Sequence, residues 1–187
     1  GSIGTQTLEV ISSRRDQFEV AGISAGGSDV GLFAQRILDF SIPVVAIARE
    51  DAAEELQRAL TVQAGSRGLA VPNPRILTGP DASTQLAAMP ADVVCNAISG
   101  AVGLRPTLAT LAAGTTLALA NKESLVIGGR LVTQAAGPGQ IVAVDSEHSA
   151  FAQCLRGGGH NEVRRLVLTA SGGPFRGRDR ASLVDVS

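Results

Sequence analysis

The stretch Thr115-Thr116-Leu117-Ala118-Leu119-Ala120-Asn121-Lys122-Glu123-Ser124 decides the fold that the sequence predicts. Residues 115–120 form a short apolar run, which is typical of a strand that is covered on both faces in a parallel sheet. The polar residues that follow lead into apolar residues at helical spacing over residues 124–136. A buried strand that passes through a polar turn into a helix is the unit from which α/β proteins are built.

The same alternation of strand and helix patterns continues over most of the chain. We expect strands over residues 18–23, 43–48, 75–77, 93–98, 115–120, 141–144 and 163–169. We expect helices over residues 5–11, 29–40, 51–60, 82–89, 104–113, 124–136 and 147–155, and a further helical segment opens at residues 181–187. The pattern predicts an α/β fold with a doubly wound, Rossmann-like, mainly parallel sheet, followed by the start of an α+β catalytic domain. Because a glycine- and proline-rich break falls at residues 137–139, we place the domains at 1–139 and 140–187.

Length, charge and cysteine content narrow the class of protein. The 187 residues suffice for one ordinary domain and the start of a second. A formal net charge of -1 gives no sign of a nucleic-acid or anionic-membrane partner. No apolar run reaches the roughly 18 residues of a membrane span. We expect Cys95 and Cys154 to be reduced packing residues in a cytoplasmic protein.

Two glycine-containing segments fit a dinucleotide site. Gly1-Ser2-Ile3-Gly4 precedes a helix, where glycines allow a pyrophosphate to approach the backbone. An ordinary turn before a helix fits the same pattern. Ser24-Ala25-Gly26-Gly27-Ser28 stands where an NAD site would carry an acidic residue, and its small residues leave room for a 2′-phosphate. This loop favours NADP over NAD, although a plain loop at a strand end fits equally well.

Asp145-Ser146-Glu147-His148 follows the strand expected at residues 141–144. In an extended segment, Asp145 and Glu147 would project to the same side. Two close carboxylates repel each other unless a cation lies between them, and Mg²⁺ or Mn²⁺ suits oxygen ligands. The alternative is a helix start, with Asp145 or Ser146 as the N-cap and Glu147 in the first turn. His148 receives no role.

Two further polar clusters are candidates for binding residues. Lys122 can hold a substrate oxygen or phosphate, and Asn121 and Glu123 can bond ribose hydroxyls. Capping of the following helix by Asn121 fits equally well. Ser171, with two glycines after it, could form a phosphate-binding nest or a tight loop.

Together, four segments resemble the successive signatures of the 1-deoxy-D-xylulose 5-phosphate reductoisomerase family. They are residues 1–6, 120–125, 144–149 and 168–175, in the family's order and at compatible spacing. The resemblance implies an NADPH- and divalent-metal-dependent enzyme of the non-mevalonate isoprenoid pathway. Such an enzyme rearranges 1-deoxy-D-xylulose 5-phosphate and then reduces the aldehyde to 2-C-methyl-D-erythritol 4-phosphate. The alternatives are an ordinary NADP-dependent dehydrogenase without rearrangement and a non-catalytic nucleotide-binding module.

The resemblance also implies a role for each matched residue. The NADPH-binding residues would be Gly1, Ser2 and Ile3 at the pyrophosphate, Gly26 near the adenosine end, and Asn121 and Glu123 on the nicotinamide side. The residues that contact substrate would be Lys122, Ser146, Glu147 and Ser171, with Lys122 and Glu147 catalytic. Asp145 and Glu147 would be two of three carboxylates that bind Mg²⁺, Mn²⁺ or Co²⁺.

The chain also departs from the family pattern. Gly27 and Ser28 stand where some members carry Lys and Asn, so the contact to the 2′-phosphate is open. We expect a truncation at both ends, with the first sheet strand missing before residue 1 and the third carboxylate missing after residue 187. Such a fragment would have little or no turnover. The full-length parent would be a cytoplasmic homodimer that acts on a sugar phosphate.

Overall fold

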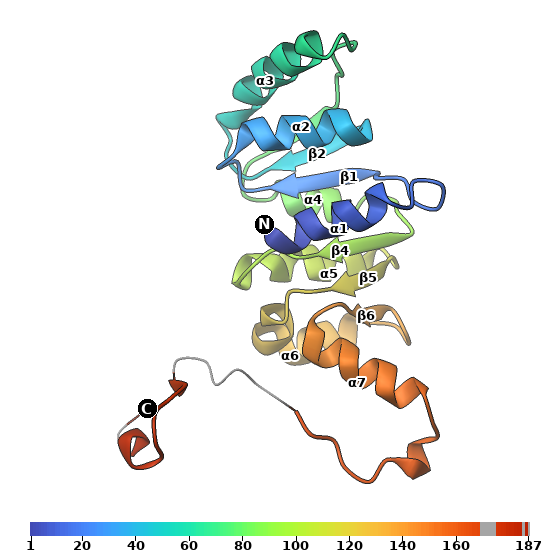
Figure 1. Cartoon of the computed structure of the whole chain (residues 1–187), viewed down its shortest axis with the longest axis vertical. Coiled ribbons are helices and arrows are strands. Elements are labelled where there is room, and N and C mark those ends of the chain that lie inside the picture. The colour runs from blue at the N-terminus through green and yellow to red at the C-terminus, as the bar shows by residue number, and fades with distance from the viewer. Residues whose placement is uncertain (169–174, 185, 187) are drawn as a thin grey trace. The chain divides into compact units, whose positions relative to one another are not determined.

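A computed structural model describes residues 1–168, 175–184 and 186. The chain divides into two compact units, Gly1–Val144 and Asp145–Ser187 (Figure 1). The first unit contains both sheets and most of the helices. No described helix has the length and hydropathy that a membrane span requires.

The first unit contains two parallel three-stranded sheets. One has the order β1-β2-β3, and its strands are β1 (Gly22–Ala25), β2 (Val44–Ile47) and β3 (Arg75–Thr78). The other has the order β4-β5-β6, and its strands are β4 (Val93–Asn96), β5 (Thr116–Leu119) and β6 (Ile141–Ala143). The predicted α/β fold with parallel strands is therefore confirmed.

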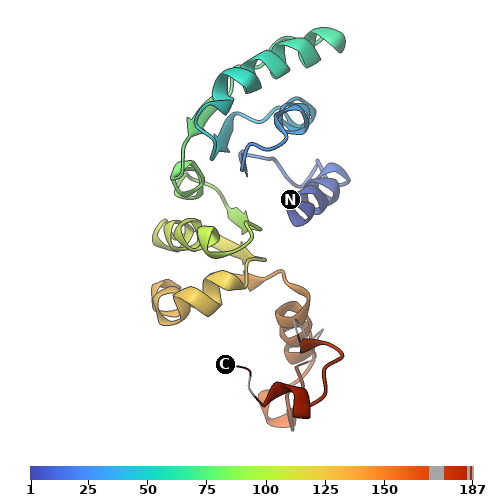
Figure 2. The same cartoon turned by 90° about the vertical axis from the view of Figure 1, so that its left-hand side faces the viewer.

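Helices connect the strands and cover both faces of the sheets. Those of the first unit are α1 (Ser2–Ser12), α2 (Val30–Phe40), α3 (Ala52–Ser66), α4 (Ala82–Ala87), the short 3₁₀ helix η1 (Ala101–Gly103), α5 (Leu104–Ala112) and α6 (Glu123–Ala135). In the turned view, α1 and α2 lie on one side of the strands and α4, α5 and α6 lie on the other (Figure 2). The second unit contains α7 (Ser146–Arg156) and two 3₁₀ helices, η2 (His160–Glu162) and η4 (Ala181–Leu183).

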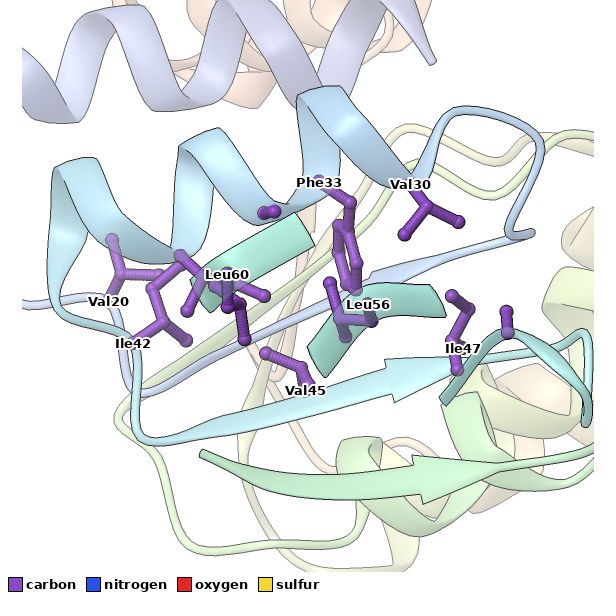
Figure 3. Packing of buried hydrophobic residues seen from close by; sticks show 11 residues of the cluster. Val20, Val30, Phe33, Ile42, Val45, Ile47, Leu56 and Leu60 are labelled. Atoms are coloured by element: carbon purple, nitrogen blue, oxygen red, sulfur yellow. The ribbon is translucent and has the colours of Figure 1, made fainter. Parts of the chain in front are cut away.

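The central strand β2 is apolar at every position because both of its faces are covered. Val45 and Ile47 are fully buried in the larger core beneath α2 and α3 (Figure 3). Ala46 points to the opposite face, where it packs against Ala82 of α4. Because successive strand residues face opposite sides, a strand covered on both sides must be apolar throughout. A second core, around Leu117 and the neighbouring helices α5 and α6, repeats this arrangement.

Strands β1 and β4 each pair on one side only within the described residues. Helix α1 packs beside both of them. Leu8 and Ile11 join the larger core, and the hydroxyl of Thr7 lies 3.9 Å from the sulfur of Cys95 in β4. An edge of this kind is a place where another strand can add.

Several elements differ from the prediction. The strand expected at residues 18–23 begins only at Gly22, because pairing with β2 covers residues 22–25 alone. Residues 163–168 form no strand, since no described strand pairs with them, and a short run without a partner is not stable as a strand. Residue 169, the last residue of that expected strand, lies outside the described residues. Cys95 and Cys154 form no disulfide, but both are exposed, so their prediction as packing residues is wrong.

The boundary between the two units differs from the predicted domain boundary at 139/140. Strand β6 hydrogen-bonds to β5 and belongs to the first unit. The side chain of Gln140 also donates to the carbonyls of Leu111 and Thr115, both at 3.0 Å. Residues 140–144 therefore pack with the first unit, and the functional division into two domains stays a prediction.

Burial predicts how the larger core responds to truncation. Leu56→Ala, in α3, should lower the free energy of unfolding by about 2–5 kcal/mol, because Leu56 is fully buried and a cavity would remain. Val62 lies in the same helix but is 71% exposed, so Val62→Ala should change the free energy of unfolding by no more than about 0.5 kcal/mol. Urea denaturation followed by circular dichroism measures both. Equal losses in the two variants would contradict the described core.

Candidate functional site

The ends of β4 and β5 carry a cluster of buried polar side chains. Asn96 ends β4, Asn121 follows β5, Thr107 lies in α5 and Ser124 lies in α6. None of the four is more than 3% exposed. Buried polar groups destabilise a fold unless they are hydrogen-bonded, and here they bond to one another and to the backbone.

Asn121 joins the loop after β4 to the start of α6. Its Nδ2 donates to the carbonyl of Ile98 and, at 2.9 Å, to the carbonyl of Gly100. Its Oδ1 accepts from the backbone N–H of Ser124 at 2.7 Å and from the Ser124 hydroxyl at 2.8 Å. The bond to the Ser124 N–H satisfies an otherwise unpaired donor in the first turn of α6, which is the capping role that the sequence left open.

Lys122 and Glu123 stand beside this capped helix start. Lys122 is the N-cap residue of α6 by backbone position, and Glu123 is the acidic residue of its first turn. Lys122 is exposed and Glu123 is half-buried. The turn after β5 therefore presents a cation and a carboxylate at the end of a parallel strand, where open α/β sheets bind their ligands.

In the second unit, Asp145 is the N-cap of α7. Its side chain accepts from the backbone N–H of His148 at 3.0 Å, and Nδ1 of His148 lies 2.8 Å and 2.9 Å from its two oxygens. The hydroxyl of Ser146 donates to Oε2 of Glu147 at 2.9 Å. Because α7 begins at Ser146, the helix-start alternative for Asp145 and Glu147 is confirmed, and the extended alternative is wrong. Both carboxylates instead lie at a helix start, where negative charge is favourable.

The donor chemistry of this acidic pair suits a hard divalent cation, since carboxylate oxygens are the ligands that Mg²⁺ prefers. Within the described residues, however, no group of three His, Cys, Asp or Glu side chains could hold a metal ion. Asp145 and Glu147 thus supply two ligands of a suitable kind. Capping and metal binding are compatible, because a carboxylate has about four acceptor sites.

The predicted pyrophosphate residues belong to α1 rather than to a separate turn. Gly1 is the N-cap of α1, and Ser2 and Ile3 lie in its first turn. A Cβ added at Gly1 or at Gly26 would meet no atom within 4 Å, so neither glycine is required by neighbouring protein atoms. The space beside both glycines is open to another group.

The backbone conformation at position 27 requires glycine, and the close packing there places Arg49 beside the loop after β1. Its φ is +98°, and an added Cβ would lie 2.9 Å from the Cβ of Arg49. The guanidinium of Arg49 pairs with Asp51 at 3.1 Å and with Glu55. Arg49 is not among the residues expected from the sequence, because it follows a different strand. The position of Arg49 at the end of β2 was the only signal, since parallel neighbours end at the same edge of a sheet.

Cys95 is the one thiol in the first unit, and its environment is not that of a nucleophile. The residue as a whole is exposed, but partial desolvation of its thiol raises the pKa of Cys95, and the hydrogen bond with Thr7 only partly opposes this effect. A raised pKa lowers the fraction of thiolate, which is the reactive form.

Apart from Gly1, Ser2 and Ile3 at the start of α1 and Gly26 after β1, the described candidate residues form two groups, each within its own unit. Asn121, Lys122 and Glu123 lie together after β5, and Asp145, Ser146 and Glu147 lie together at the start of α7. Ser171 lies outside the described residues.

The parallel sheets, the helices on both faces and the polar strand ends define an α/β protein of the Rossmann-like class. The family model described as 1-deoxy-D-xylulose 5-phosphate reductoisomerase matches residues 1–129, and the model of that enzyme's C-terminal domain matches residues 141–187. The chain therefore belongs to the 1-deoxy-D-xylulose 5-phosphate reductoisomerase family.

Individual relatives agree with the family. The 1-deoxy-D-xylulose 5-phosphate reductoisomerase of Cutibacterium acnes is 91% identical over all 187 residues, which are 46% of that protein. The Zymomonas mobilis enzyme in complex with NADPH superposes with a TM-score of 0.81 at 36% identity, covering 100% of this chain and 47% of that one. A reductoisomerase in complex with magnesium gives a TM-score of 0.78 at 31% identity, covering 100% and 48%. The chain thus spans about half the length of these relatives.

The capping role of Asp145 can be tested apart from any metal. Asp145→Ala should destabilise the start of α7 by about 1 kcal/mol, because the His148 N–H loses its acceptor. Asp145→Asn should have little effect, since asparagine caps as well as aspartate. Hydrogen exchange of the His148 amide measures both, with faster exchange expected in the alanine variant alone. Equal exchange in all three proteins would contradict the capping contact.

Proposed function

We propose that this chain is part of an NADPH- and divalent-metal-dependent reductoisomerase that converts 1-deoxy-D-xylulose 5-phosphate to 2-C-methyl-D-erythritol 4-phosphate. The observation that carries the proposal is the turn after β5, where Asn121, Lys122 and Glu123 follow a buried parallel strand inside a chain that two models of this family match. The enzyme belongs to the non-mevalonate route to isoprenoids.

The nucleotide would lie along the strand ends of the first unit. Three observations support NADPH as the cofactor. The solved relative from Zymomonas mobilis is a complex with NADPH. The glycines at positions 1 and 26 leave open space beside the backbone, as close contact with a nucleotide requires. The loop after β1 carries no carboxylate until Asp29, whose side chain caps α2 by accepting from the Leu32 N–H at 2.8 Å.

Gly1, Ser2 and Ile3 would then receive the pyrophosphate at the positive end of α1. Gly26 would adjoin the adenosine end, and Glu123 would meet the nicotinamide side.

Asp145 and Glu147 would hold the divalent metal, which is Mg²⁺, Mn²⁺ or Co²⁺. Their oxygen donors and the magnesium complex of a solved relative support this assignment. A metal held by these two carboxylates would supply Lewis-acid stabilisation of negative charge on substrate oxygens.

The chain's own side chains would bind and orient the substrate. Ser146 and Glu147 would contact substrate oxygens, and Ser171 would contact the substrate phosphate. Lys122 would stabilise the negative charge that develops on the substrate during rearrangement, because a positive charge beside that oxygen lowers the energy of the charged state. We further propose that the full-length enzyme is a cytoplasmic homodimer.

The acid-free loop after β1 predicts cofactor choice. The chain should bind NADPH more tightly than NADH in a fluorescence titration. Gly26→Asp should lower that preference about tenfold or more, because a carboxylate repels the 2′-phosphate and accepts bonds from a ribose with free hydroxyls. The new side chain has room, since a Cβ at Gly26 meets nothing within 4 Å. Gly65→Asp, at an equally open position in α3, is the matched control. An unchanged preference in Gly26→Asp would argue against this placement of the cofactor.

The acidic pair predicts a separation of metal and nucleotide binding. Asp145→Asn, made at the matching position of the full-length Cutibacterium acnes relative, should abolish metal-dependent turnover while the affinity for NADPH remains. Asparagine keeps the helix cap but removes the charge that attracts the metal. Initial rates against metal concentration, with cofactor fluorescence as the control, test this. Turnover that survives both this substitution and a chelator would indicate an ordinary dehydrogenase.

A further inference from the structure

Four buried side chains form one continuous chain of hydrogen bonds between β4 and α6. Nδ2 of Asn96 donates to the Thr107 hydroxyl at 2.8 Å, and that hydroxyl donates to the Ser124 hydroxyl at 3.3 Å. The Ser124 hydroxyl then donates to Oδ1 of Asn121 at 2.8 Å. Every hydroxyl in this chain both donates and accepts, and linked bonds of this kind reinforce one another.

The Asn121 amide has no bonding capacity left for a ligand. Its two N–H donors are both engaged by backbone carbonyls, those of Ile98 and Gly100. Its oxygen accepts two bonds from Ser124, which fills both lone pairs. The side chain is only 2% exposed, so a nucleotide could not reach it without breaking these bonds.

The chain of bonds instead fixes the loop after β4. Asn121 holds the carbonyls of Ile98 and Gly100, while Asn96 bonds to the carbonyl of Gly103 and the N–H of Ile98, at 2.8 Å and 3.1 Å. The packing is close. A Cβ at Gly103 would lie 2.3 Å from Nδ2 of Asn121. The loop and the start of α6 therefore form one rigid piece.

We infer that Asn121 is a positioning residue whose buried amide, with Asn96, Thr107 and Ser124, sets where Lys122 and Glu123 stand relative to the loop at residues 98–103. Its side chain does not contact the nucleotide. This inference rests on the proposed function, in which Glu123 lies at the nicotinamide side of NADPH.

The test removes one hydroxyl that lies inside the network and away from any ligand. Thr107→Val keeps the shape of the side chain but breaks the link between Asn96 and Ser124. Thr110→Val is the matched control. Thr110 is equally buried in the same helix, but its hydroxyl donates to the carbonyls of Pro106 and Ala87 instead. Both variants replace a buried threonine of α5, so a general loss of stability should affect them alike.

Two probes separate positioning from general destabilisation. NADPH carries the nicotinamide, and 2′-phospho-ADP-ribose lacks it. Thr107→Val should raise the Kd for NADPH about tenfold and leave the Kd for 2′-phospho-ADP-ribose unchanged, because only the nicotinamide side is displaced. Thr110→Val should change neither value. Ser124→Ala should likewise raise the Kd for NADPH and leave the Kd for 2′-phospho-ADP-ribose unchanged. In the double variant Thr107→Val, Ser124→Ala, the loss of NADPH binding free energy should be smaller than the sum of the two single losses, since both substitutions act through one network.

The outcomes are distinct. A wild-type chain that binds neither probe would contradict the proposed function. A wild-type chain that binds both, with Thr107→Val and Ser124→Ala binding NADPH normally, would overturn the positioning role alone. An equal weakening of both probes would also overturn it, because that result indicates general destabilisation. If a variant melts below the assay temperature, the amide exchange of Ile98 at a lower temperature decides. Exchange should be faster in Thr107→Val than in Thr110→Val.

Discussion

Parallel pairing of very short strands, of which β2 and β5 are the most deeply buried, is the constraint on which the rest of this structure depends. Each described strand has three or four residues, and in β2 every one of the buried positions faces a helix. Such a strand has no room for a functional side chain. Chemistry is therefore confined to the turns beyond the strands, and parallel pairing brings neighbouring turns to one edge. The polar residues after β5 are where they are because the strand before them cannot be polar.

The same constraint explains why buried polar groups gather at that edge. A turn between a buried strand and a helix leaves backbone donors and acceptors away from water, and each must find a partner. Asn121 satisfies two carbonyls of the loop after β4 and one N–H of α6. A turn that carries functional side chains thus also needs neighbouring buried side chains that satisfy its backbone groups. Lys122 is exposed and Glu123 is half-buried, while Asn121 and Ser124 on either side of them are buried.

The sequence predicted what depends on local pattern and missed what depends on contacts between distant segments. The apolar runs at 43–48 and 115–120 specify strands unambiguously, and the observed β2 and β5 lie within them. The run at 163–168 combines Val and Leu with two arginines and has no described partner, and pairing cannot be inferred from the run itself. Arg49 was missed for the same reason, because it lies against Gly27, which is remote in sequence. Asn96 bonds to the nearby Ile98 N–H and Gly103 carbonyl, and it was missed because the strand expected at 93–98 placed it inside a strand.

Helix capping and ligand binding were left as alternatives at both Asn121 and Asp145, and side-chain chemistry separates the two positions. Both residues cap a helix in the structure. An amide has two donors and one acceptor oxygen, so at Asn121 the protein contacts occupy the whole group, which is the basis of the inferred positioning role. A carboxylate accepts at about four sites and carries a full charge, so capping does not exclude a metal ion. The capping alternative therefore competes with function at an asparagine but is compatible with it at an aspartate. A strand-end Asn-Lys-Glu and a strand-end Asp-Ser-Glu are, for this reason, not equivalent signals, although their position in the fold is the same.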